Sequence, residues 1–237
     1  MSELLNALGQ LVGAPLLRWI APPLPPKEAH AGRFCRTEPL DAARHAAALS
    51  EAYAADADGR MWTYLPYGPF ASADAYRGWV EERAAESDPS FYAVVDRATD
   101  RAVGVVAYQH IDPPNGVIEL GHLAFAPALR GTPAGTEAMY LMLSRAFALG
   151  YRRVEWKCDA LNQASRRAAE RFGFTFEGIF RQHMVVKGRN RDTAWYSLLD
   201  TEWPATRRAF ESWLSPRNFD GDNKQRCSLS SIRNGVL

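Results

Sequence analysis

The sequence predicts a single α/β (α+β) domain with a mixed, mostly antiparallel central sheet flanked by helices. Three observations support this class. Helix and strand patterns alternate from Arg33 onward. Asn115-Gly116 stands between two apolar runs and is the strongest hairpin signal in the chain. Beyond it, the order strand, helix, strand, helix, strand implies some parallel pairing, so we expect a mixed sheet.

The first half is expected to hold two helices and a run of strands. A strand over 34–40 leads to Asp41, which caps an alanine-rich helix that ends near Ala55. After an irregular aromatic segment, Ser72 caps a second helix that ends near Ser87. The next strands predict an antiparallel meander over residues 91–95, 102–111 and 117–125.

The second half begins with a clear helix signal. Thr132 is an N-cap, Pro133 occupies the first helical position, and Gly150 supplies the left-handed stop. A strand, a helix and two more strands are then expected, over 154–158, 163–172, 174–186 and 193–199. An amphipathic helix should follow Trp203, and a polar, poorly ordered tail should begin near Arg217.

Composition excludes several classes of protein. The chain has 28 Lys+Arg against 27 Asp+Glu, a net charge of +1, whereas a dedicated nucleic-acid binder carries a large basic excess. The basic stretch 181–191 is more typical of a solvated hairpin tip. Cys35, Cys158 and Cys227 are odd in number and scattered, which argues for a reducing, cytoplasmic compartment and against a zinc site or any other metal centre.

Residues 1–32 are predicted to form an arm outside the domain proper, which either packs on the domain or partners another chain, the first being favoured. Leucines from Leu4 to Leu11 recur at helical spacing, so a short amphipathic helix is expected there, and the proline-rich segment 21–26 should be extended. The arm lacks the features of a secretory signal, and no run is long enough for a membrane span. We expect the domain over 33–201 and a C-terminal helix and tail over 202–237.

A helix N-terminus directly follows the strand 117–125. Such an end presents unpaired N–H groups and the positive pole of the helix dipole, which suit a phosphate. The segment 129–136 adds a cation, Arg130, and small residues at this point. In isolation the segment is more typical of a well-capped, closely packed helix than of a phosphate site.

Residues further along favour the phosphate interpretation. A second motif with characteristic spacing is formed by Asn162, Ser165, Gly173-Phe174 and Glu177-Gly178. With the preceding strand-loop-helix order, it resembles the GNAT family of acyl-CoA-dependent N-acyltransferases, and more narrowly the RimJ/RimL type, which acetylates protein amino termini and small amines. Arg130 and Gly135 match the family's pyrophosphate motif, whereas Pro133 replaces its first glycine. The resemblance covers about residues 33–201.

The resemblance implies how acetyl-CoA is held. The sheet would splay between its fourth and fifth strands and open a V-shaped slot for the pantetheine arm. The pantetheine would contact Leu123, Ala124 and Phe125 through their backbones, and Asn162. The pyrophosphate would face the amides of Arg130, Gly131, Thr132, Ala134, Gly135 and Thr136. Pro133 has no N–H, so one hydrogen bond is missing or replaced, and we expect weaker or re-registered phosphate binding.

The resemblance also implies that Ser165 returns a proton to the departing CoA thiolate. Without it, Asn162 and Ser165 would be interpreted as a helix cap and a helix residue. Cys158 could carry the acetyl group covalently, but a strand cysteine is far more often an inert packed residue. We therefore favour direct transfer within a ternary complex.

The amine acceptor must lose a proton, since an α-amino group titrates near 8 and a lysine near 10.4. Glu119 on the central strand is the candidate base, and the alternative is a solvated residue on the outward face. Asp159 and His183 are further candidates. His122 should point away from the side of Glu119, because side chains alternate along a strand.

The acceptor should bind beside the aromatic loop 61–70. Trp62, Tyr64 and Tyr67 could form a wall that stacks on an apolar acceptor or holds a cation. Alternatively, the loop is a hydrophobic lid packed on the domain. A peptide amino terminus, an amino acid and an amine antibiotic all remain compatible, and the chain could be a monomer or a homodimer.

Two other functions stay open at this point. Pro133 and the uncertain base are compatible with a degenerate GNAT-like module that binds CoA without turnover. The arm 1–32 and the tail 217–237 could instead carry an interaction function on a scaffold domain.

Overall fold

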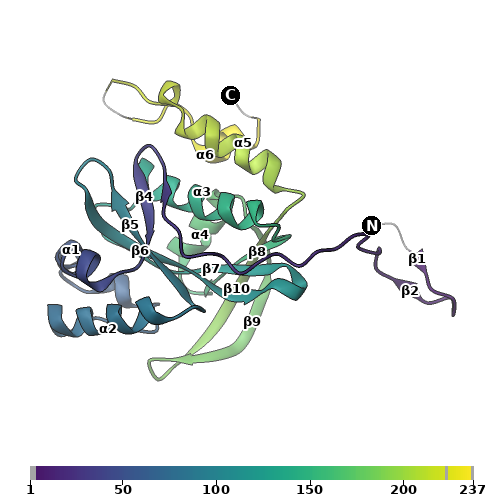
Figure 1. The fold of residues 1–237 in the computed structure, drawn as a ribbon, viewed down its shortest axis with the longest axis horizontal. Coiled ribbons are helices and arrows are strands. Elements are labelled where there is room, and N and C mark those ends of the chain that lie inside the picture. Colours follow the sequence, from purple (N-terminus) through teal and green to yellow (C-terminus); the bar gives the residue numbers. More distant parts are fainter. Residues whose placement is uncertain (1–3, 222–223, 236–237) are drawn as a thin grey trace.

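A computed structural model describes residues 4–221 and 224–235 and is organised around an eight-stranded sheet in the order β3-β4-β5-β6-β7-β8-β10-β9 (Figure 1). The strands are β3 (His30–Ala31), β4 (Cys35–Pro39), β5 (Ser90–Asp96), β6 (Arg101–Asp112), β7 (Val117–Phe125), β8 (Arg153–Asp159), β9 (Thr175–Val186) and β10 (Arg189–Leu199). In this sheet β7 and β8 pair in parallel, and the other neighbouring pairs are antiparallel. The predicted mixed, mostly antiparallel sheet is confirmed.

Helices cover both faces of the sheet. The helices are α1 (Ala42–Ala54), α2 (Ala73–Ala85), α3 (Pro133–Ala148), α4 (Gln163–Arg171), α5 (Trp203–Leu214) and α6 (Leu229–Arg233). Strand β5 shows the division, because alternate residues join different cores. Phe91 and Ala93 pack with α1 and α2, whereas Tyr92 and Val94 pack with α3 and α5. Helix α3 lacks the length and apolarity of a membrane span, and so do the other helices in the described part of the chain.

Three predicted helix starts are confirmed by their capping hydrogen bonds. The side chains of Asp41, Ser72 and Thr132 accept hydrogen bonds from the backbone N–H three residues ahead, which satisfies a donor that the helix itself cannot. Pro133 occupies the first turn of α3 as expected. The hairpin at Asn115-Gly116 exists too, but its turn is a short 3-10 helix, η2 (Pro113–Asn115).

The sheet opens in its middle, as the family resemblance implied. β7 and β8 are paired only from Val117–Arg153 to Glu119–Glu155. Beyond that level both strands continue, β7 to Phe125 and β8 to Asp159, without facing each other as partners. The result is a splay whose apex lies at Glu119 and Glu155.

Both chain ends differ from expectation. The predicted amphipathic helix near Leu4 is instead a small hairpin of β1 (Leu4–Leu5) and β2 (Leu11–Val12), because Asn6 caps a tight turn through the N–H groups of Leu8 and Gln10. The poorly ordered tail is also wrong for the described residues. There, a 3-10 turn, η3 (Pro216–Asn218), leads to α6, whose Leu229 is fully buried against the main core.

The arm packs on the domain only in its second part. Tyr151 and Tyr92 donate hydroxyl hydrogen bonds to the carbonyls of Pro23 and Pro26. Nearer the N-terminus, the arm extends away from the body (Figure 1) and exposes a row of large apolar side chains, namely Leu4, Leu5, Leu8, Leu11, Val12, Leu16 and Leu17.

A buried carboxylate joins the chain entering the domain to α3. Glu137 is 4% exposed and accepts hydrogen bonds from the backbone N–H groups of Arg33, Phe34 and Cys35 at 2.8, 2.6 and 2.8 Å. A Cβ at Gly32 would lie 2.2 Å from the Glu137 carboxyl carbon, so only glycine allows this approach. Glu137 thereby fixes β4 against the N-terminal part of α3.

We expect Glu137→Gln to lower the free energy of unfolding by about 2–4 kcal/mol, since hydrogen bonds to a charged group are worth about 1.5–3 kcal/mol each and an amide NH₂ would face other donors. Urea denaturation measures this. Glu211→Gln is the matched surface control, because the hydrogen bonds of Glu211 with Tyr140 and Arg207 are exposed to solvent, and it should change stability by less than about 1 kcal/mol. Equal effects of the two variants would contradict the role of Glu137.

Candidate active site

A cavity of about 640 Å³ lies where β7 and β8 separate, a size typical of small-molecule sites. It brings together residues from distant parts of the chain. Its polar and titratable lining consists of Gln109, His110, Glu119, His122, Lys157, Cys158, Asp159, Asn162, Ser165, His183, Arg191 and Thr193. The predicted acid, Ser165, and the predicted base, Glu119, thus lie in one cavity.

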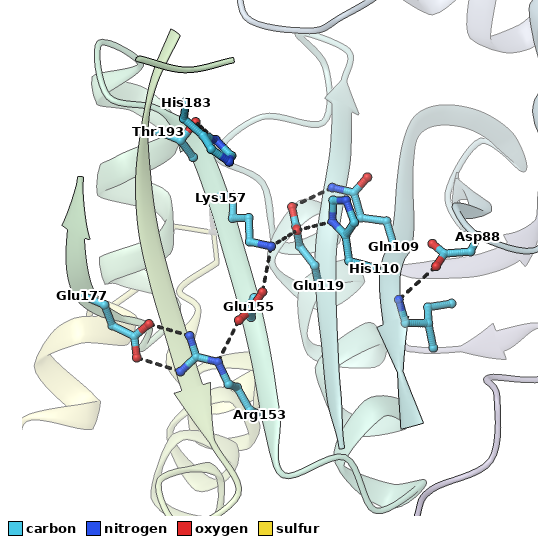
Figure 2. A network of polar contacts seen from close by, with 11 residues as sticks. Asp88, Gln109, His110, Glu119, Arg153, Glu155, Lys157, Glu177, His183 and Thr193 are labelled. Atoms are coloured by element: carbon cyan, nitrogen blue, oxygen red, sulfur yellow. Dashed lines mark hydrogen bonds and ion pairs between the residues drawn. The ribbon is translucent and has the colours of Figure 1, made fainter. Parts of the chain in front are cut away.

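Glu119 is the centre of a polar network (Figure 2). It is 2% exposed, which excludes the solvated outward position that the sequence left open. Its Oε1 accepts a hydrogen bond from Gln109 Nε2 at 2.6 Å, and its Oε2 pairs with His110 Nδ1 at 2.7 Å and Lys157 Nζ at 2.9 Å. Both carboxylate oxygens are therefore engaged.

Lys157 holds the apex of the splay. Its Nζ lies 2.8 Å from Glu155 and 2.9 Å from Glu119 (Figure 2). It also lies 3.9 Å from the centre of the Trp195 ring. Arg153 continues the network from Glu155 at 2.9 Å to Glu177 at 2.7 and 2.5 Å. Acidic and basic groups alternate along this chain, so each charge has an opposite neighbour.

These contacts set the charges in the cavity. Burial pushes the pKa of Glu119 upward, but the hydrogen bond from His110 and the charge of Lys157 outweigh it, and the net pKa is below its usual value. The same hydrogen bond raises the pKa of His110. Burial lowers the pKa of His122 to about 4, so that ring is neutral at pH 7. Glu119 is a carboxylate and a weak base at this pH.

The position of His122 corrects the sequence-based expectation. It was expected on the side opposite Glu119, yet both line the cavity. A β-bulge in β7 shifts the register between the Val105–Ala124 and Ala107–Gly121 pairs, and His122 has φ +53°. The bulge breaks the alternation on which the expectation rested.

Ser165 has a hydroxyl suited to donation. Its Oγ accepts a hydrogen bond from Trp156 Nε1 at 3.0 Å, and a second hydrogen bond joins the Ser165 and Cys158 side chains. Asn162 caps α4 through Oδ1 to the Ser165 N–H at 3.1 Å, so the structural interpretation of this pair holds, while the Asn162 side-chain NH₂ has no partner in the described part of the chain. Burial raises the pKa of the neighbouring Cys158, which keeps that thiol protonated.

The phosphate loop offers fewer free amides than the resemblance implied. Thr132 Oγ1 already accepts from the Gly135 N–H, and the Arg130, Thr132 and Thr136 amides bond to carbonyls at 3.2–3.4 Å. The amides of Gly131 and Ala134 have no partner among the described residues. Two open N–H groups at a helix N-terminus remain suited to a pyrophosphate.

The three β7 residues predicted to hold pantetheine differ in the direction in which their backbone N–H and C=O groups point. Ala126 N–H donates to Val103 at 3.0 Å, so by the alternation of an antiparallel ladder Ala124 also turns its groups toward β6. Its carbonyl accepts from Tyr53 at 2.8 Å. Leu123 and Phe125 turn theirs toward the splay, where Arg130 Nε reaches the Phe125 carbonyl at 2.9 Å.

The aromatic loop roofs the cavity, but mostly with residues other than those predicted. Trp62 is 6% exposed and packs in the core against the rings of Tyr53 and Phe70, and Tyr67 stacks on Trp79 and His122. Of the three predicted aromatic residues, Tyr64 reaches the cavity, beside Met61, Leu65 and Pro66. These neighbours belong to the loop 61–70 that was expected beside the acceptor, but they were not among the residues predicted to form its wall.

Two hydrogen bonds tie this roof to the other side of the splay. Tyr64 Oη donates to the Leu161 carbonyl at 3.4 Å, and Lys187 Nζ donates to the Trp62 carbonyl at 2.7 Å. Lys187 is thus a bridging residue rather than part of a solvated hairpin tip.

A splayed mixed sheet, a helix N-terminus with open amides and a cavity at the apex together define a CoA-dependent acyltransferase, and these residues fit acetyl-CoA. The family model described as an acetyltransferase (GNAT) domain matches residues 37–175. The chain therefore belongs to the GNAT family of N-acetyltransferases, whose members transfer acetyl from acetyl-CoA to amines, and the family predicted from the sequence is confirmed.

Known relatives agree with this assignment. A GCN5-related N-acetyltransferase from Brucella melitensis has 46% identity and a TM-score of 0.91, over 92% of this chain and all of that one. An uncharacterized N-acetyltransferase, p20, from Bacillus licheniformis is 25% identical over 62% of this chain and 84% of its own. A Salmonella typhimurium enzyme that modifies the N-terminal serine of a 50S ribosomal subunit protein shares the fold, with 20% identity and a TM-score of 0.61, over 71% of this chain and 96% of that one.

Acetyl-CoA should bind the parent protein measurably in calorimetry, and Pro133→Ala should bind it up to about tenfold more tightly. The variant restores an N–H at the first helical position, and one hydrogen bond to a charged group is worth about 1.5 kcal/mol. Pro127→Ala, at an exposed position of the same loop, should leave affinity unchanged.

Binding by Pro133→Ala with none by the parent would identify a degenerate phosphate loop and a protein without acetyl transfer.

Proposed function

We propose that the chain acetylates a primary amine, of a peptide amino terminus or a small molecule, by direct transfer in a ternary complex. The observation that carries this proposal is the single cavity at the splay, because it contains Ser165 on one wall and the Glu119 network on the other. Bound acetyl-CoA supplies a thioester acetyl group and a thiolate leaving group. The chain's residues must orient the amine, remove its proton and protonate the thiolate.

The pantetheine site proposed here uses the open edge of β7. Leu123 and Phe125 turn their backbone groups toward the splay, and Asn162 has its side-chain NH₂ available on the opposite side. Gly131 and Ala134 supply N–H groups for the pyrophosphate. Arg171 adds a cation beside this helix end, where it donates to Thr136 Oγ1 at 3.1 Å.

The acceptor side is formed by the roof loop. Tyr64, Met61, Leu65 and Pro66 present a mostly apolar wall to the cavity. Glu119, the base predicted from the sequence, lies on this side, yet both of its oxygens are engaged and its pKa is lowered. We therefore assign it an anchoring and electrostatic role.

We propose the cytoplasm as the compartment, because the reaction consumes acetyl-CoA and the three cysteines are free thiols that need no oxidising environment.

We propose further that the projecting arm contacts a second copy of the chain. Arg18 is the one charged residue between positions 4 and 26, and the arm exposes Leu5, Leu8, Leu11 and Leu17 by 64–84%. Soluble monomers rarely expose so continuous an apolar surface, and an arm of this length approaches the 20–30 residues that each side of a stable interface contributes.

Ser165→Ala should lower turnover at least tenfold with little change in acetyl-CoA affinity, because the thiolate loses its proton donor while the binding surface stays. Steady-state rates and calorimetry measure the two effects. Ser144→Ala, on α3 away from the cavity, is the control for loss of a hydroxyl. Unchanged turnover would remove Ser165 from the acid role.

Removal of residues 1–17 should convert a homodimer into a monomer, as measured by light scattering coupled to size exclusion. The domain contacts of the arm begin near Trp19 and are retained in this variant. A monomeric full-length chain, or a dimer that survives the truncation, would contradict the assignment of the arm.

A further inference from the structure

Two β-bulges lie beside the cavity, one in β6 and one in β7. β6 shifts register between Gln109 and Asp112, and β7 shifts between Gly121 and Ala124. A histidine stands at each bulge with a positive φ, +46° at His110 and +53° at His122. Such backbone conformations are uncommon for residues other than glycine and concentrate at functional sites.

The bulge in β6 lets two successive side chains, those of Gln109 and His110, point to the same side of the strand. Successive residues of a regular strand point to opposite faces, yet Gln109 and His110 both bond the Glu119 carboxylate, at 2.6 and 2.7 Å (Figure 2). Asp88 secures the distorted backbone next to them by accepting the Ile111 N–H at 3.0 Å. The distorted strand thereby brings the His110 ring into contact with Glu119.

The contact fixes which nitrogen of His110 is available. An ionised carboxylate only accepts hydrogen bonds, so His110 Nδ1 carries the hydrogen that faces Glu119. In the neutral ring Nε2 then holds the lone pair. The His110 side chain is 68% exposed and lines the cavity, so Nε2 is accessible to an acceptor bound there.

We propose that His110 is the catalytic base of this enzyme and that Glu119 is its positioning residue. This inference rests on the proposed amine acetylation. The acceptor reacts as the neutral amine, after one proton has passed to solvent: its lone pair forms the C–N bond to the acetyl carbonyl while the C–S bond breaks, and His110 Nε2 takes the second proton from the nitrogen. The thiolate receives a proton from Ser165, and His110 and Ser165 exchange protons with solvent afterwards.

The other candidates in the cavity are placed less well for this task. His122 is packed between the rings of Tyr67 and Phe91, at 5.5 and 4.8 Å. His183 Nδ1 contacts Thr193 Oγ1 at 2.9 Å. Among the cavity-lining histidines in the described residues, His110 is the one with a carboxylate partner.

Charged groups around His110 set the pH range of the step. Glu119 on β7 and Asp88 before β5 stabilise the protonated ring, whereas Lys157 on β8 opposes it, and His122 lies nearby on β7. The net result is a pKa above the ordinary 6.5. Activity should therefore rise with pH through that raised pKa, because only the neutral ring accepts a proton.

The test compares kcat/KM against pH, with one amine acceptor, in wild type and two matched variants. His110→Asn tolerates the positive φ and still donates a hydrogen bond to Glu119, but it has no titrating nitrogen. Its kcat should fall at least a hundredfold. The decrease in kcat/KM at low pH that we assign to His110, the acid limb of the profile, should also disappear. Glu119→Gln should keep that limb and move it to lower pH, since the ring loses its carboxylate.

Chemical rescue provides a second activity readout. His110→Gly suits the backbone at this position and leaves space for a free ring, so added imidazole should restore turnover. Retention of the acid limb in His110→Asn together with its loss in Glu119→Gln would overturn the proposal and return the base role to Glu119. So would a His110→Asn enzyme with wild-type kcat.

A titration by NMR separates this inference from the proposed function. The His110 ring should titrate above 6.5 in the wild type and nearer 6.5 in Glu119→Gln, whether or not an acceptor has been found. A protein that shows this shift but acetylates no amine would contradict the proposed function. A His110 that titrates identically in both proteins would overturn the pairing itself.

Discussion

The separation of β7 from β8 beyond Glu119 and Glu155 is the constraint on which the remaining site depends. Two neighbouring parallel strands would normally stay hydrogen-bonded, and here two glutamates face each other at the last paired level. Lys157 lies between these like charges and neutralises both at 2.8–2.9 Å. The apex of the splay is thus an electrostatic junction, and the strand edges above it are not paired with each other.

Burial makes this junction sensitive to any change in its members. A buried charge without a partner is far more costly than the pair is favourable, so each group requires its neighbours. The alternation runs from His110 through Glu119, Lys157, Glu155 and Arg153 to Glu177. It couples the floor of the cavity to the β9 edge of the sheet. Glu137 acts similarly near α3, where it fixes the strand entering the domain beside the phosphate loop.

Much of the fold could be predicted because its signals are local. Asp41, Ser72 and Thr132 bond backbone groups three residues away, so their caps are visible in the sequence. The partners of Glu119 are not local, since Lys157 is brought to it by a parallel strand pairing. Bulges are not visible in the periodicity of the sequence either. They direct the side chains of His122 and His110 to positions that strict alternation along a strand does not predict. The position of Trp62 in the core similarly depends on the ring of Tyr53 from α1 and on rings further along its own loop.

In the proposed reaction one residue donates a proton and another accepts one, and the two residues are held in different ways. Ser165 stands on α4, a regular helix, where its side chain is held by hydrogen bonds with Trp156 and Cys158 from β8. His110 stands on a distorted strand, because an undistorted one would turn either Gln109 or His110 away from Glu119. In the proposed reaction, the serine that protonates the thiolate lies beside Trp156 and Cys158, and the base that becomes a cation lies beside a carboxylate. The difference between the two walls therefore follows from the charge that each must bear during the reaction.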